Sequence, residues 1–184
     1  MGSCHSVTVS PPSYTSFPSY KGAGILFLEG PVALAGIQKY PKVLKGAKAV
    51  LSGLGGHREP TDQDWSYTAW REVIEELFHV PSVPLALLQD LRTIPFRFPP
   101  IYSQDYVLLR LGFNDLKTAL VFCRKHKIQS ELYKTMPLTL NDLILERCLH
   151  SSAEIGALAL VPSDPFVTIA PEFSSDLNMI KTNL

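Results

Sequence analysis

Three carboxylates in this chain are spaced so that one helix would carry them on one side. Glu72, Glu75 and Glu76 lie three and four residues apart, which makes them neighbours on an α-helix. Like charges this close destabilise a helix unless a cation neutralises them. Hard divalent cations such as Mg²⁺ take carboxylate oxygens as ligands, usually together with substrate phosphates. The ordinary interpretation of three acids on a helix is a solvated acidic surface. The residues around the acids must therefore decide between such a surface and a cation site.

A glycine turn precedes this helix. Residues 53–59 read Gly-Leu-Gly-Gly-His-Arg-Glu. Thr61 is a candidate N-cap with Asp64 three residues on, a variant of the capping box. Pro81 requires the helix to end by about residue 80. Apolar residues recur at helical spacing over 65–77, and the three acids lie off that stripe. The sequence therefore predicts a helix with a buried face and an acidic face that starts beside a glycine turn.

The other elements predict an α/β fold. Short β-prone runs are bounded by Gly and Pro, which mark turns. Residues 116–125 fit either a short helix or a strand. Strands interleaved with two substantial helices favour an α/β sandwich with a mixed sheet. We expect strands over 24–29, 32–37, 47–51, 87–97 and 106–113, the first two as a hairpin, and a second amphipathic helix over 142–159.

Composition bounds the class of protein. The 184 residues are 46% hydrophobic and 18% charged, as in globular domains, and 17 basic residues balance 17 acidic ones. No net field steers the chain toward nucleic acid, so we expect no sequence-specific nucleic-acid partner. Cys4, Cys123 and Cys148 are far apart and cannot all pair, which indicates a reducing compartment. No apolar run reaches the roughly 18 residues of a membrane span, and we expect a cytoplasmic protein.

The N-terminus carries an acylation pattern. Gly2 follows Met1, and Ser6 occupies the favoured hydroxyl position for myristoylation. One myristoyl chain binds membranes only marginally, and a palmitoylated Cys4 would supply the second signal. Chance and a Gly-Ser cloning remnant are the alternatives. Membrane attachment through Gly2 and Cys4 is therefore a prediction for testing.

The glycine turn and the acidic helix resemble the Nudix hydrolase family. Residues 71–77 fit the second half of its box, Arg-Glu-aliphatic-any-Glu-Glu, and residues 53–59 resemble its glycine turn. The resemblance implies a Nudix-type α/β/α sandwich with a mixed sheet between helices, over residues 21–161. An extended arm (1–20) would precede this domain and a C-terminal extension (162–184) would follow it.

The resemblance assigns roles by position. Glu72, Glu75 and Glu76 match the family's catalytic, metal-binding carboxylates, and the backbone carbonyl of Gly55 or Gly56 would add a ligand for Mg²⁺ or Mn²⁺. The cations would bridge pyrophosphate oxygens and neutralise developing charge. A carboxylate or a metal-bound hydroxide would activate the attacking water. The implied reaction is hydrolysis of the pyrophosphate linkage in a nucleoside diphosphate derivative.

The box departs from the family pattern at two places. Arg71 resembles the catalytic-site arginine that pairs with a box carboxylate and fixes the helix against the glycine loop. One extra residue in the spacing puts the family's middle Glu on Asp62 counting forward or on Gln63 counting back, with Asp64 also near. Phe78 replaces the glycine that follows Glu-Glu, so we expect the helix to end without its usual left-handed residue, with Phe78 packed inward.

Further residues are candidates for contact with substrate. His57 follows the glycines, although a solvated loop histidine is the simpler interpretation, and Glu131 is the nearest downstream acid that could join the site. The remaining candidates are Arg58, Tyr102, Tyr106 and, as a group behind the metal ligands, His79.

Two functions remain open. The first is a metal-dependent hydrolase acting on a nucleotide-derived small molecule. The second is a catalytically inactive Nudix-fold module that serves as a binding or structural component of a larger assembly. The extra residue, the missing middle Glu and Phe78 favour the second.

Overall fold

The computed structural model describes residues 19–39, 49–150 and 152–162. The predicted acylation residues Gly2 and Cys4, most of the expected N-terminal arm and nearly all of the C-terminal extension lie outside these ranges. The described residues therefore fall almost entirely within 21–161, the range expected to form the domain.

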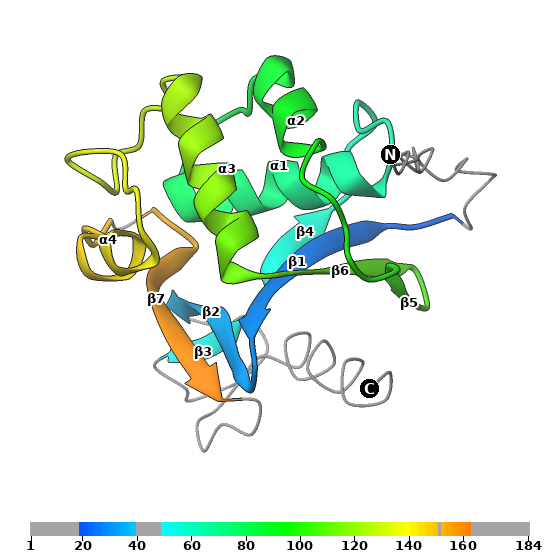
Figure 1. Cartoon of the computed structure of the whole chain (residues 1–184), viewed down its shortest axis with the longest axis horizontal. Helices are drawn as coiled ribbons and strands as arrows, with labels where there is room; N and C mark the ends of the chain where they lie inside the picture. Colours follow the sequence, from blue (N-terminus) through cyan, green and yellow to red (C-terminus); the bar gives the residue numbers. More distant parts are fainter. Residues whose placement is uncertain (1–18, 40–48, 151, 163–184) are drawn as a thin grey trace, which may run out of the picture.

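A seven-stranded sheet organises this part (Figure 1). Its main path runs β3-β2-β1-β6-β5, while β4 pairs with β1 and β7 pairs with β2. The β1–β6 pair is parallel and the other pairs are antiparallel, which confirms the predicted mixed sheet. The strands are β1 (Gly22–Glu29), β2 (Val32–Lys39), β3 (Ala49–Ser52), β4 (Leu54–His57), β5 (Ile101–Ser103), β6 (Tyr106–Leu111) and β7 (Ile155–Pro162).

Side chains alternate across β1 and divide the core in two. Ile25 and Phe27 join the larger cluster, which holds the buried apolar residues of all four described helices. Leu26 and Leu108 join a smaller cluster in which every fully buried member comes from a strand. The described helices thus pack on one face of the sheet, and the α/β class is confirmed. The helices are α1 (Trp65–Phe78), α2 (Leu85–Leu91), α3 (Phe113–Lys125) and α4 (Leu140–Leu145).

Two element predictions are wrong. The expected strand over 87–97 is α2 followed by a loop. Its buried residues Leu87, Leu88 and Leu91 follow helical spacing, which a short apolar run does not reveal by itself. The expected helix over 142–159 is the short α4 followed by β7, which gains a full antiparallel ladder with β2. Residues 116–125, left open between helix and strand, belong to α3.

Helix α1 differs from expectation at both ends. Asp64, and not Thr61, is its N-cap, because the Asp64 carboxylate accepts from the backbone N–H groups of Ser66 and Tyr67. His79 is its C-cap in the left-handed conformation, with φ 51° and ψ 53°. The left-handed residue is therefore present, one position after Phe78. Phe78 itself is fully buried and packs edge-on to the Tyr133 ring.

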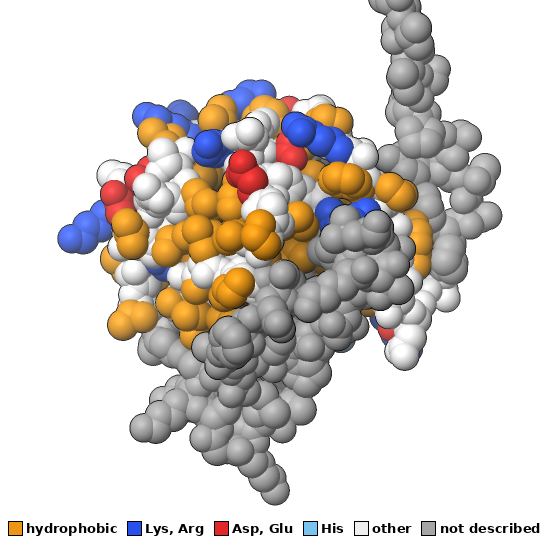
Figure 2. Space-filling view, turned by 60° about the horizontal axis from the view of Figure 1, so that its bottom comes forward, with side chains coloured by type: hydrophobic (Ala, Val, Ile, Leu, Met, Phe, Trp, Pro, Cys, Tyr) orange, Lys and Arg blue, Asp and Glu red, His pale blue; other side chains and the backbone are white. Residues whose placement is uncertain are grey.

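The described surface mixes charge types. On the face in Figure 2, Lys and Arg side chains lie apart from one another, among acidic, neutral and apolar ones. Cys123 and Cys148 are free thiols, and burial raises the pKa of Cys123 to about 12. Among the helices that the structure describes, none has the length and apolar character needed to cross a membrane.

Replacing Phe78 tests the end of α1. We expect Phe78→Ala to lower the free energy of unfolding by about 3–5 kcal/mol, because it leaves a cavity between α1 and Tyr133. Val121→Ala, on the exposed side of α3, is the control and should cost less than about 0.5 kcal/mol. Urea denaturation of both variants measures this. Equal losses would contradict the assigned packing.

Candidate active site

Strand β4 and helix α1 approach each other at the glycines. The Gly55 N–H donates to Glu76 Oε2 at 2.8 Å. A Cβ added at Gly56 would lie 2.6 Å from Glu72 Cδ, closer than real Cβ atoms come. Any side chain at position 56 would therefore have to displace the Glu72 carboxylate. The structure brings two of the three predicted acids directly against the glycine turn.

Arg71 connects this turn to the helix. Its Nη2 donates to the His57 carbonyl at 2.7 Å. Its Nε and Nη2 reach both oxygens of Asp62 at 3.0 and 2.9 Å, a bidentate pair. Nη1 donates to Glu72 Oε1 at 3.0 Å and to Glu75 Oε2 at 2.9 Å. The partner of Arg71 left open between Asp62 and Gln63 is thus Asp62.

Asp62 is buried and hydrogen-bonded by several groups. The residue is 5% exposed and also accepts from Thr68 Oγ1 and from the Glu59 N–H, both at 2.9 Å. Burial opposes its ionisation, but hydrogen bonds from Arg71, Glu59 and Thr68 outweigh burial and lower the pKa of Asp62. An ionised Asp62 therefore holds the buried Arg71 guanidinium in place.

The three predicted acids have raised pKa values. Burial raises the pKa of Glu72 and of Glu75, and the charge of Arg71 offsets part of this effect. Burial raises the pKa of Glu76 well above its usual value, and the Gly55 hydrogen bond only partly compensates. The charges of Glu72 and Glu154 add to this shift. The single guanidinium of Arg71 therefore neutralises only part of the negative charge that the three ionised acids would place on this side of α1.

This set of donors fits a hard divalent cation. Every side-chain donor is a carboxylate oxygen, which Mg²⁺ and Mn²⁺ prefer. The bonds to Arg71 use only part of the acceptor capacity of Glu72 and Glu75, because an ionised carboxylate offers about four lone-pair sites. The carboxylate oxygens of Glu72, Glu75 and Glu76 nevertheless do not all lie within 4.8 Å of one another. Among the described residues, His79, Glu131 and His150 do meet that spacing.

The other residues predicted to contact substrate lie in different surroundings. His57 is exposed and contributes its carbonyl to Arg71. Arg58 lies over the Tyr20 ring, 4.8 Å from its centroid. Tyr102 is exposed on β5. The Glu131 carboxylate pairs with His150, so its predicted place beside the box acids gains no contact in the structure.

The structure also locates Tyr106 and the two tryptophans of α1. The Tyr106 hydroxyl lies where a Cβ at Gly24 or Gly55 would be, so Tyr106 touches the glycine turn. Trp65 and Trp70, within the apolar stripe predicted over 65–77, are buried core residues, and Trp70 packs against Phe27.

Sequence reasoning missed Arg147. Its Nη2 donates to the carbonyls of Glu76 and Ile155 at 2.9 and 2.8 Å. Its Nη1 donates to the carbonyl of Leu77 at 2.5 Å and to the Tyr133 hydroxyl at 3.0 Å. Arg147 thus holds the last turn of α1, which carries Glu76. Its neighbours in sequence give no signal of this role, because its partners in α1 lie some 70 residues away.

Comparisons with known proteins add little. Neither the models of known protein families nor the curated proteins include a match to this chain. A solved structure similar to it is a bifunctional NMN adenylyltransferase/ADP ribose pyrophosphatase from Francisella tularensis, in complex with AMP and a manganese ion. The identity is 13% and the TM-score 0.41. The alignment covers 91% of this chain and 41% of that one, so this chain spans less than half of that protein's length.

Asp62→Asn tests the buried ion pair. We expect a loss of about 3 kcal/mol in unfolding free energy at neutral pH, because the buried Arg71 loses its charged partner. The folded pKa of Asp62 lies below the unfolded value of about 3.9. Its contribution is therefore present above that pH and is lost as the pH falls through the folded pKa. The difference between wild type and variant should shrink in acid.

Chemical denaturation from neutral pH into the acid range measures this difference. Glu29→Gln, exposed at the end of β1, is the control and should match wild type throughout. A difference between Asp62→Asn and wild type that does not depend on pH would contradict the ionised state of Asp62.

Glu76→Gln tests the cost of the buried acid. Because the folded pKa of Glu76 is raised, this acid destabilises the fold increasingly as the pH rises above its unfolded pKa, and fully above its folded pKa. We therefore expect Glu76→Gln to melt at a higher temperature than wild type at neutral pH with EDTA. This advantage should shrink as the pH falls below the folded pKa of Glu76 and disappear near the unfolded pKa of about 4.3, where wild type is protonated in both the folded and the unfolded state. Melting curves from neutral pH down to about pH 4 measure this, and a variant less stable than wild type at every pH would contradict it.

Proposed function

We propose that this protein is a Nudix-type hydrolase that uses a divalent metal ion to cleave the pyrophosphate linkage of a nucleoside diphosphate derivative. The observation that carries the proposal is the position of the acids. Glu72 and Glu76 lie against the glycines of β4, and Arg71 ties Glu72 and Glu75 to the same turn.

Each residue has a defined task in this proposal. Arg71 and Asp62 fix α1 against the glycine turn, so the acids are held before any ligand arrives. Glu72, Glu75 and Glu76 hold Mg²⁺ or Mn²⁺, together with the carbonyl of Gly55 or Gly56. When bound, the cation neutralises charge on the pyrophosphate oxygens.

Proton transfer is the second task. One of the clustered carboxylates accepts a proton from the attacking water. The carboxylate that serves is the one that reaches the attacking water, because a bound cation would lower the pKa of the acids that hold it.

A binding module without catalysis is the second candidate. The observation that favours it is the internal pairing of the acids. Arg71 Nη1 bonds to both Glu72 and Glu75, and the Gly55 N–H bonds to Glu76. A cluster satisfied in this way holds together without a cation. Cation binding therefore separates the two candidates.

The test combines turnover with calorimetry. Purified protein is incubated with a panel of nucleoside diphosphate derivatives and Mg²⁺ or Mn²⁺. We expect turnover that depends on the cation and falls roughly 100-fold or more in Glu72→Gln and in Glu76→Gln, as for loss of an acid–base group. Glu29→Gln should keep the wild-type rate, because Glu29 is exposed at the far end of β1.

Calorimetric titration of Mg²⁺ or Mn²⁺ completes the test. The hydrolase predicts binding that Glu76→Gln weakens. No turnover on any substrate, with Glu76→Gln and wild type alike in cation binding, would overturn the hydrolase and leave the binding module.

A further inference from the structure

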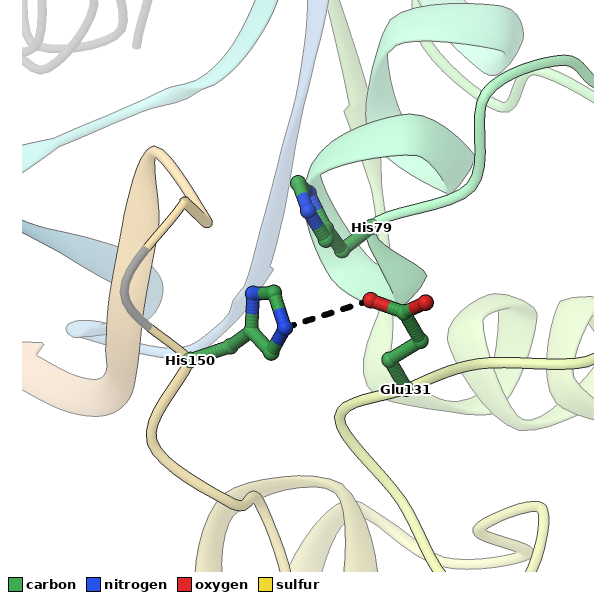
Figure 3. Close-up of side chains that lie close together, drawn as sticks. All are labelled: His79, Glu131 and His150. Atoms are coloured by element: carbon green, nitrogen blue, oxygen red, sulfur yellow. Dashed lines mark ion pairs between the residues drawn. The ribbon is translucent and has the colours of Figure 1, made fainter.

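A second cluster of metal-ligating side chains lies beyond the C-terminal end of α1. His79, Glu131 and His150 come from three segments far apart in sequence and gather at one place (Figure 3). One ligand atom of each lies within 4.8 Å of the others. His150 Nε2 is 3.2 Å from Glu131 Oε2, and the two imidazole centroids are 5.1 Å apart.

Hydrogen bonds outside the cluster hold the three segments together. Ser130 Oγ donates to the carbonyl of Phe78 at 2.5 Å, which ties the residue before Glu131 to the residue before His79. The Cys148 N–H donates to the Leu132 carbonyl at 2.7 Å, which brings the third segment alongside. The three side chains are therefore neighbours whether or not a ligand is bound. Such a scaffold lowers the cost of ordering a site when a metal arrives.

A serine hydroxyl orients both rings. Ser152 Oγ lies 2.9 Å from His79 Nε2 and 2.8 Å from His150 Nδ1. With His150 Nδ1 engaged there, Nε2 of the same ring is directed at Glu131. Metal-binding histidines commonly use one ring nitrogen as ligand and fix the ring with a hydrogen bond at the other. His150 has this arrangement.

The backbone fixes the direction of His79. As the left-handed C-cap of α1 it donates its N–H to the Glu75 carbonyl at 2.7 Å. The His79 imidazole lies beside the His150 ring, with 5.1 Å between their centroids, near the Glu131 carboxylate (Figure 3). Few residues other than glycine, asparagine, aspartate and histidine tolerate this conformation readily.

We infer that His79, Glu131 and His150 bind a transition-metal ion of the Zn²⁺ class, at a site separate from the carboxylate cluster of Glu72, Glu75 and Glu76. Two imidazoles and one carboxylate suit Zn²⁺, whereas Mg²⁺ prefers oxygen ligands alone. Ligand atoms around tetrahedral Zn²⁺ lie about 3.4 Å apart, given bonds of about 2.1 Å. The His150–Glu131 distance of 3.2 Å already matches.

Partial exposure leaves room for a further ligand. The side chains of His150 and Glu131 are 35% and 70% exposed. Water can therefore complete the coordination, as at zinc sites with three protein ligands. A bound ion would join the end of α1 to the segments around residues 131 and 150.

Cobalt provides the direct measurement, because tetrahedral Co²⁺ absorbs visible light when it occupies a zinc site. We expect wild-type protein to develop this absorption, to lose it when Zn²⁺ is added and to keep it when Mg²⁺ is added. His79→Asn and His150→Gln should each weaken Co²⁺ binding by at least about tenfold, since each removes a ligand. Asn suits the left-handed backbone at 79, and His150→Gln leaves the helix cap untouched.

Two controls isolate the site. His126→Gln removes an imidazole that pairs with the Asp90 carboxylate at 2.7 Å, the same chemistry without a second histidine. Glu72→Gln removes an acid of the carboxylate cluster. Both should develop the tetrahedral Co²⁺ absorption as wild type does, and a Glu72→Gln protein without hydrolytic activity that retains this spectrum would separate the two sites. Absent absorption in wild type, or absorption unchanged in both His79→Asn and His150→Gln, would overturn the inference and leave an ordinary ion pair.

Discussion

The buried guanidinium of Arg71 is the constraint on which the candidate site depends. It is 7% exposed, and a charge removed from water is costly unless partners surround it. Asp62 provides a bidentate partner, and the His57 carbonyl, Glu72 and Glu75 provide the others. Because these partners come from both the glycine turn and α1, satisfying one charge also fixes the helix relative to the strand.

Helix α1 is secured independently at its two ends. At the start, the Asp64 cap is held by Arg92 at 2.6 Å. At the finish, Arg147 binds the carbonyls of Glu76 and Leu77, which lack partners within the helix. The second half of the helix can therefore carry three acids with raised pKa values, because contacts at both ends of the helix hold it in addition to those made by the acids. The free-energy cost of burying these acids is thus offset by contacts elsewhere in the fold.

The sequence predicted what short-range patterns determine. The β1–β2 hairpin, the apolar stripe of α1 and the acids beside the glycines all follow from local spacing. The strand predicted over 87–97 and the helix predicted over 142–159 are wrong because short apolar runs fit either period until tertiary contacts choose. Asp62 was one of two possibilities, since one extra residue shifts the register of the box. Arg147, with partners about 70 residues away, had no local signal.

The last turn of α1 links the two clusters of ligands. Glu75 and Glu76 lie on it, and His79 caps it by donating its N–H to the Glu75 carbonyl. The ligand types differ: carboxylates alone on the side of the helix, and imidazoles with one carboxylate at its end. Hard cations favour the first set and Zn²⁺ the second. In the two proposals, one helix therefore contributes to two different donor sets, oxygen alone and nitrogen with oxygen, each suited to a different class of cation.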